Sequence, residues 1–125
     1  MRRNRSACAA EGIELLCWRD VPTDDDAIGE MALAAKPALV QALLRRPQGL
    51  DDTTAERLAY RAERRARRAC AEQDVRYYAA SWSFLTVTYK AMADADQLDG
   101  FYPDLRDERF SSALAPLARR LKAFQ

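Results

Sequence analysis

The sequence contains no histidine, and it has only four glycines and three cysteines. Without histidine, a Ser-His-Asp triad, a Cys-His pair and a histidine general base are all excluded. Neither GxGxxG nor GxxxxGK followed by Ser or Thr occurs, so a phosphate-cradling loop is not expected. Cys8, Cys17 and Cys70 are odd in number and widely spaced, which fits neither a disulfide framework nor the paired ligands of a zinc site. Chemistry based on carboxylates, lysine, tyrosine or an N-terminal amine remains open.

An excess of one charge and long apolar runs are also missing. The 125 residues carry 20 Lys and Arg against 19 Asp and Glu, a net charge of +1, which excludes a strong field of one sign over the whole chain. No run approaches the ~20 apolar residues of a membrane helix. No apolar stretch follows the basic start at residues 1–5, so we expect a cytoplasmic location. The length fits one domain at most.

Patterns of both strands and helices are present. Residues 1–10 are polar and are expected to form a loose segment. Residues 13–21 carry apolar side chains on both faces, which predicts a strand buried on both sides. The acidic residues 24–26 supply capping oxygens for a short helix at residues 27–35. Residues 38–45 fit a helical stripe and a buried strand about equally well.

The middle of the chain gives the clearest local pattern. Small apolar residues recur at helical spacing over residues 54–72, behind a capping-box pattern of Thr53 and Glu56, which predicts a helix. Its packing stripe is mostly alanine, so it can approach a neighbour closely. Residues 77–90 alternate as two strands, and the alternation changes phase at residues 84–85, which predicts a turn or bulge there.

The last third is predicted from weaker signals. A short helix is expected over residues 94–101 and a loop over residues 103–107. Residues 110–114 could form one more strand, and residues 116–125 form a basic tail of helical character.

The predicted helix is rich in arginine. A row of guanidinium groups on one face could contact nucleic-acid phosphates. Alternatively, the arginines form a solvated face that Glu56, Glu63 and Glu72 partly balance, which the net charge of only +1 favours. The arginines are Arg57, Arg61, Arg64, Arg65, Arg67 and Arg68.

Three other groups each allow a chemical and a structural interpretation. Asp24, Asp25 and Asp26 could bind a metal, but consecutive side chains diverge, so helix capping is favoured. Cys8 could be a nucleophile if nearby arginines lowered its pKa, but a small apolar role is favoured. Aromatic residues of the predicted strands could stack on bases, but at strand spacing core packing is favoured. They are Tyr77, Tyr78, Trp82, Phe84 and Tyr89.

Several motifs occur together in a fixed order. The stretch 11–22 contains WRDVP, 28–37 contains IGE and ends in proline, 78–90 contains TVTYK, and 101–114 contains FYPDL and RFSSAL. With the arginine-rich helix between them, these blocks resemble the N-terminal class II glutamine amidotransferase domain of the glutamate synthase large subunit. The resemblance covers residues 10–115.

The resemblance implies an α+β fold of the N-terminal-nucleophile hydrolase type, an αββα sandwich of mostly antiparallel strands with flanking helices. This chain would be an interior piece, incomplete at both ends. Residues 1–10 would be loose, residues 11–115 would form part of the domain, and residues 116–125 would be a divergent basic tail. The resemblance also favours a strand over residues 38–45.

The resemblance further implies a function in nitrogen assimilation. In the family, the domain hydrolyses glutamine, and the ammonia reaches a synthase domain that uses FMN and an iron–sulfur cluster to convert 2-oxoglutarate to glutamate. The family's nucleophile is an N-terminal cysteine upstream of the matched region, so its role is not carried over to Cys8. Arg120 aligns with a substrate-binding arginine, but the residues after it differ from the family's FSTN. Cys17 replaces the family's usual glycine.

We therefore predict a truncated or remnant amidotransferase domain that is inactive alone. No catalytic, substrate-binding, cofactor or metal residue is assigned in this chain. Partners would be the remaining glutamate synthase segments, or a second copy through open sheet edges. No membrane is expected, and nucleic-acid binding by the arginine-rich helix is the less favoured alternative.

Overall fold

The computed structural model describes residues 2–111. The chain divides into two compact units, Met1–Arg19 with Val40–Lys90 (unit 1) and Asp20–Leu39 with Ala91–Gln125 (unit 2). Over the described residues, no helix combines the length and the apolar character that crossing a bilayer requires. The helices and the antiparallel strand pair place the fold in the α+β class, as predicted.

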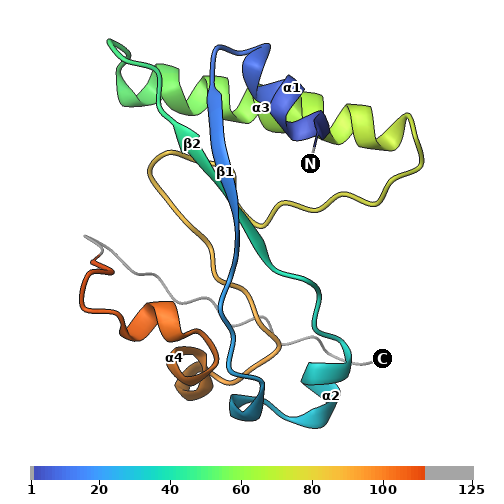
Figure 1. Ribbon diagram of the computed structural model, residues 1–125, viewed down its shortest axis with the longest axis vertical. Coiled ribbons are helices and arrows are strands. Elements are labelled where there is room, and N and C mark those ends of the chain that lie inside the picture. The colour runs from blue at the N-terminus through green and yellow to red at the C-terminus, as the bar shows by residue number, and fades with distance from the viewer. Residues whose placement is uncertain (1, 112–125) are drawn as a thin grey trace. The chain divides into compact units, whose positions relative to one another are not determined.

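A two-stranded sheet forms the frame of unit 1. Its strands, β1 (Glu14–Asp20) and β2 (Val40–Arg45), are neighbours and run in opposite directions (Figure 1). They confirm the strand predicted over residues 13–21 and the strand that the resemblance favoured over residues 38–45. The Arg45 Nε lies 2.8 Å from the Glu14 carboxylate, which links the start of β1 to the end of β2.

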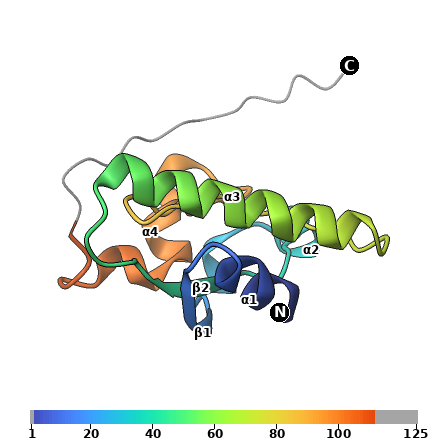
Figure 2. The same ribbon diagram turned by 90° about the horizontal axis from the view of Figure 1, so that it is seen from above.

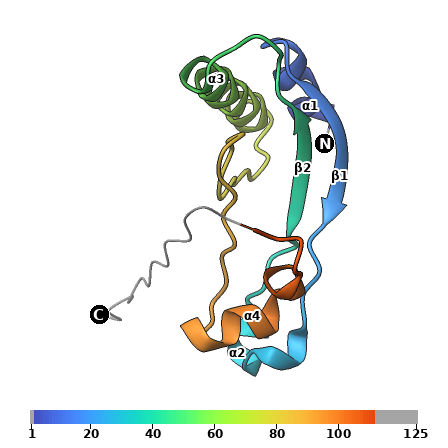
Figure 3. The same ribbon diagram turned by 90° about the vertical axis from the view of Figure 1, so that its left-hand side faces the viewer.

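The described residues do not bury β1 fully on both faces, so the prediction of burial on both faces is wrong. Leu15 is buried, whereas Leu16, which points to the opposite face of the strand, is 42% exposed. The reason is that α3 packs on one side of the strands (Figure 3). On the opposite face, Trp18 packs partly against the core, while Leu16 is left largely uncovered by the described residues.

Two helices pack against each other in unit 1. They are α1 (Arg2–Ala9) and α3 (Asp52–Ala71), which lie side by side (Figure 2). The alanine stripe of α3 is buried, with Ala59, Ala62 and Ala66 fully covered. Residues 1–10 therefore contain a helix that their polar composition did not lead us to expect. The small residues of α3 allow this close approach, and Cys8 of α1 fills the contact.

The helix predicted over residues 54–72 is confirmed, but its cap is not the predicted one. The Asp51 carboxylate accepts a hydrogen bond from the Thr54 N–H at 2.6 Å. The capping box of Thr53 and Glu56 is wrong, because the Glu56 carboxylate binds a distant segment instead. A carboxylate at the N-cap also favours the positive end of the helix dipole.

The two strands predicted over residues 77–90 are not present, and this prediction is wrong. A bend at residues 84–85 confirms the turn, but the arms on either side are extended without pairing as strands. Ser83 and Ser81 hydroxyls accept from backbone amides here, including the Thr88 N–H at 3.1 Å. Such local side-chain bonds compete with a strand ladder, and an isolated hairpin is marginal in water.

Unit 2 is built from short helical turns. Phe101 and Tyr102 form its buried centre, with ring centroids 4.6 Å apart. The backbone N–H of Asp24 donates to the Phe101 carbonyl at 2.9 Å, which joins the two sequence segments of the unit. Its elements are η1 (Asp25–Ala27), α2 (Glu30–Ala34), η2 (Ala95–Gln97), α4 (Leu98–Phe101) and η3 (Pro103–Arg106).

Three predictions fall on unit 2. The helix over residues 27–35 is shorter than predicted, since Ile28 is extended and α2 begins only after Gly29. The helix over residues 94–101 is confirmed as η2 and α4, which follow a capping box at Asp94. The loop over residues 103–107 is instead the 3-10 helix η3, because Pro103 fixes a helical φ at its start.

The C-terminal predictions are tested only in part. Residues 110 and 111 are not in a strand. The rest of the predicted strand, residues 112–114, and the tail at residues 116–125 lie outside the described residues.

Candidate functional site

A buried carboxylate organises the arginine-rich face of α3. Glu11 lies in the turn after α1, and its side chain is only 2% exposed. Its Oε2 lies 3.0 Å from Arg61 Nε, and its Oε1 accepts from Arg65 Nε. Gly12 adopts φ +71°, the left-handed conformation that ends α1 and turns the chain into β1. The pair of ion contacts thus fixes this turn on the outer face of α3.

Of the other arginines of α3, only Arg67 has a carboxylate partner among the described residues. Arg67 binds Glu63 with its Nε at 2.9 Å and a terminal nitrogen at 2.6 Å. By contrast, Arg57, Arg64 and Arg68 are exposed, and the described part of the chain offers them no ion pair. The predicted balance by acidic residues is confirmed for Glu63 only.

These groups line a shallow groove of about 280 Å³. The guanidinium groups of the lining arginines are exposed, whereas the Glu11 carboxylate, the one acidic group among the described lining residues, is buried. The lining residues are Glu11, Tyr60, Arg61, Arg64, Arg65 and Arg68. The groove can therefore attract an anionic group, but no Cys, Ser or Thr side chain of the described residues lines it.

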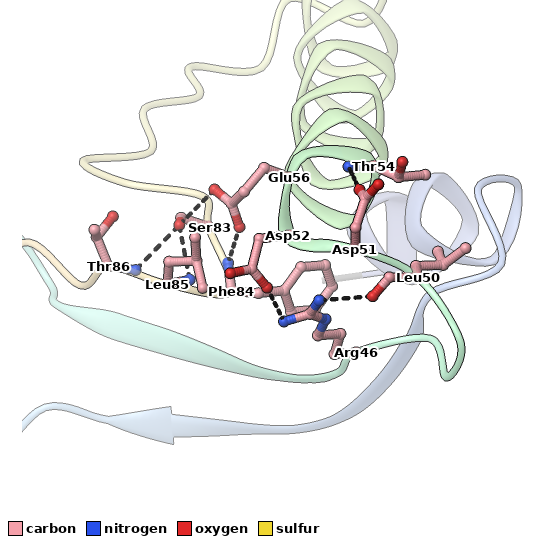
Figure 4. Close-up of polar contacts among 10 residues, drawn as sticks. All are labelled: Arg46, Leu50, Asp51, Asp52, Thr54, Glu56, Ser83, Phe84, Leu85 and Thr86. Carbon is pink, nitrogen blue, oxygen red and sulfur yellow. Dashed lines mark hydrogen bonds and ion pairs between the residues drawn. The ribbon is translucent and has the colours of Figure 1, made fainter.

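A second polar cluster joins α3 to the segment after it (Figure 4). Glu56 Oε2 accepts from the Ser83 hydroxyl at 2.6 Å, and Glu56 Oε1 accepts from the Phe84 N–H at 2.7 Å. Ser83 Oγ also accepts from the Leu85 and Thr86 amides, at 3.0 and 3.1 Å. Both lone pairs of this oxygen are occupied, so Ser83 is held for structure rather than for attack on a substrate.

The three cysteines are free, and Cys8 is unlike an activated thiol. Cys8 is fully buried beside Ile13, Leu15 and Ala62. Burial raises the pKa of the Cys8 thiol, whereas a cysteine nucleophile needs a lowered pKa. The apolar role predicted for Cys8 is confirmed.

The acidic run stabilises a turn, as the capping interpretation predicted. The Asp24 carboxylate accepts from the Asp26 N–H at 3.2 Å and caps η1, not the longer helix that was expected. Lys36 donates to Asp25 and to the Thr23 hydroxyl, and its bond holds the pKa of the Asp25 carboxyl below its usual range. Within residues 2–111, no His, Cys, Asp and Glu side chains are grouped as metal ligands.

The aromatic side chains of residues 77–90 divide between core and surface. Trp82 and Phe84 pack against the core of unit 1, as predicted. Tyr78 is 72% exposed, with Lys90 Nζ 2.9 Å from its hydroxyl and 5.0 Å from its ring centre. Burial raises the pKa of Tyr77. The Tyr77 hydroxyl and the Trp82 indole N–H are buried and find no partner among the described residues.

Two features of this region were not predicted. Glu11 and its two arginines are separated by some fifty positions, so no local spacing reveals them. The Glu56–Ser83 contact spans 27 positions and is hidden by the capping-box pattern. Arg120 lies outside the described residues.

Comparison with known proteins defines the class. A family model of class II glutamine amidotransferases matches residues 2–123. The chain belongs to the class II glutamine amidotransferase family.

Its relatives include glutamate synthases. Over 107 residues it is 38% identical to the "Glutamate synthase [NADPH] large chain" of Azospirillum brasilense, and over 106 residues it is 35% identical to that of Bacillus subtilis. It is 34% identical over 114 residues to the "Ferredoxin-dependent glutamate synthase 2, chloroplastic" of Arabidopsis thaliana. These alignments cover 85%, 84% and 88% of this chain. The chain spans 7% of the length of each relative.

Proposed function

We propose that these residues form part of the glutamine amidotransferase domain of a glutamate synthase large chain. There the domain would release ammonia from glutamine, for the conversion of 2-oxoglutarate to glutamate. The observation that carries the proposal is the 38% identity to a glutamate synthase large chain over 85% of this chain.

Within that domain, the described residues would serve as scaffold for an αββα sandwich. The 42% exposure of Leu16 on β1 fits a sheet that packs on a second layer. The unpaired arms of residues 77–90 fit strands that need neighbours from the rest of the domain. The orphaned hydroxyl of Tyr77 and indole N–H of Trp82 also fit contacts made by other segments.

The nucleophile and the residues that bind FMN and the iron–sulfur cluster would come from other parts of the enzyme. Cys8 is buried with a raised pKa, and Ser83 is fully hydrogen bonded. Cys8 and Cys70 are buried while Cys17 is exposed, so the three do not form a ligand set for an iron–sulfur cluster. These residues also offer no phosphate-binding loop for FMN. The free thiols fit a reducing compartment such as the cytoplasm.

A glutaminase assay on the purified 125-residue chain tests whether these residues are scaffold without a nucleophile of their own. We expect no ammonia release from glutamine and no glutamyl hydroxamate in the presence of hydroxylamine. The Cys8→Ala variant is the control, and it should behave like the parent chain. Turnover that is lost in Cys8→Ala would show that the chain holds its own nucleophile and would overturn the scaffold role.

A second candidate is a protein-interaction module, favoured by the unpaired arms of residues 77–90. A partner segment could add a strand to these arms. Size exclusion with light scattering at high salt tests it, with Val87→Pro as the variant that blocks pairing. A salt-resistant complex that Val87→Pro removes supports this candidate, and a monomer at every concentration refutes it.

A further inference from the structure

The near-neutral chain separates its charges between its two units. Residues 2–19 and 40–90 of unit 1 contain fourteen Lys and Arg against eight Asp and Glu. Residues 20–39 and 91–111 of unit 2 contain three Lys and Arg against eleven Asp and Glu. Unit 1 is therefore basic and the described part of unit 2 is acidic, although the whole chain carries only +1.

The positive charge of unit 1 is concentrated on one ridge. Arg57, Arg61, Arg64 and Arg68 recur every three or four residues along α3, so they lie on one face. We call this row the arginine stripe. At 1.5 Å per residue it is about 16 Å long. Like charges at this spacing disfavour a helix, and only Arg61 has a carboxylate partner among the described residues.

Several negative charges of unit 2 lie on short segments that contact one another, next to Arg106, whose Nε donates to the Asp99 carbonyl at 2.6 Å. The segments η1 and α4 are in contact, joined by the hydrogen bond from the Asp24 N–H to Phe101. Asp26 of η1, Asp96 of η2 and Asp99 of α4 are exposed, and none forms an ion pair in the described part of the chain. With Asp24, these residues make up what we call the acidic face.

We infer that the arginine stripe of one copy binds the acidic face of a second copy of this chain. Each surface carries several exposed charges that find no ion-pair partner within residues 2–111, and the two surfaces have opposite sign. When the arginine stripe of one copy binds the acidic face of another, the pair still has one free stripe and one free face. Further copies can therefore add as the protein concentration rises, unless the assembly closes into a ring. The inference goes beyond the proposed amidotransferase role, whose arguments rest on none of these charged residues.

Charge reversal on either surface tests this contact. The mass of the full chain is measured by analytical ultracentrifugation at low ionic strength and at about 1 M salt, where the screening length falls to about 3 Å. We expect association at low salt that is lost at high salt. Arg64→Glu with Arg68→Glu, and separately Asp96→Lys with Asp99→Lys, should each weaken it at least tenfold.

Mixing the two double variants identifies the surfaces. Each variant keeps one native surface, so the mixture should associate although neither variant does so alone. Arg68→Glu should weaken association more than Arg76→Glu, which makes the same change of charge at an exposed arginine beyond α3. Circular dichroism of every variant confirms that it is folded.

Other outcomes would overturn the inference. A parent chain that stays monomeric at low salt, or a mixture that does not associate, excludes contact between copies through these surfaces. Association that persists at about 1 M salt indicates apolar contacts instead. A monomer that binds a labelled oligonucleotide, and loses this binding in Arg64→Glu with Arg68→Glu, would assign the stripe to nucleic acid.

Discussion

Glu56 is the residue at which a small chemical change should have a large effect. Its carboxylate accepts from the Ser83 hydroxyl at 2.6 Å and from the Phe84 N–H at 2.7 Å (Figure 4). Ser83 Oγ already accepts from two backbone amides, so it can only donate to Glu56. In Glu56→Gln, the new NH₂ group faces a donor in either orientation of the amide. One donor must lose its acceptor.

The expected cost follows from the bonds that are lost. A hydrogen bond to a charged group contributes about 1.5–3 kcal/mol, and leaving a buried donor without an acceptor costs about 1–3 kcal/mol. Because both contacts are only partly buried, we expect Glu56→Gln to lower the free energy of unfolding by about 2 kcal/mol. A double-mutant cycle with Ser83→Ala should give a coupling of about 1–2 kcal/mol.

Urea unfolding followed by circular dichroism measures these values. With a slope of about 1–3 kcal/mol per molar urea, a loss of about 2 kcal/mol moves the midpoint by about 1 M. Glu108→Gln is the control, because Glu108 is exposed and has no hydrogen-bond partner among the described residues. A midpoint for Glu56→Gln equal to that of the control would refute the argument. So would a coupling of zero with Ser83.

Three further predictions follow from the packing, the thiols and the helix cap. Ala62→Leu should destabilise the chain by about 1–3 kcal/mol, because Ala62 is fully buried; thermal unfolding should show no such loss for Ala71→Leu at the exposed end of α3. Iodoacetamide at mild alkaline pH should modify the exposed Cys17 before the buried Cys8, as peptide mass spectrometry would show. The bond from Thr54 lowers the pKa of the Asp51 carboxyl, so its stabilisation is present above about pH 4 and is lost as the pH falls through the folded pKa. Asp51→Asn retains a cap and should flatten the dependence of the melting temperature on acid pH.

The elements that could be predicted are those whose signals lie within a few residues. The helix α3 follows from alanines at helical spacing, and η2 with α4 follows from the cap at Asp94. The strand β2 was ambiguous from its own residues, because a short apolar run fits either period. Residues 77–90 have strong strand propensity, but propensity requires a paired neighbour to become a strand. Ser81 and Ser83 provide the alternative bonds.

The polar contacts were harder to predict, because their partners are distant in sequence. Glu56 stands three residues after Thr53, the spacing of a capping box, yet its acceptor capacity is used by residues 83 and 84. Glu11 reads as an ordinary surface acid beside a glycine, yet two arginines of α3 cover it. One feature of the sequence did point to such a contact. Six arginines on one helix require either a nearby carboxylate or a strongly solvated surface.

The net charge of the chain was a poor predictor of whether the arginine stripe binds a partner. The net charge of +1 favoured the interpretation that the arginines of α3 are simply solvated, because phosphate-binding surfaces usually accompany a net basic charge. Electrostatic interactions between exposed groups are screened over about 10 Å at 0.1 M salt, so a partner responds to the nearest surface rather than to the total. The acidic residues that cancel the sum belong largely to unit 2. The charge that governs binding at α3 is therefore the charge of that face, which is strongly positive.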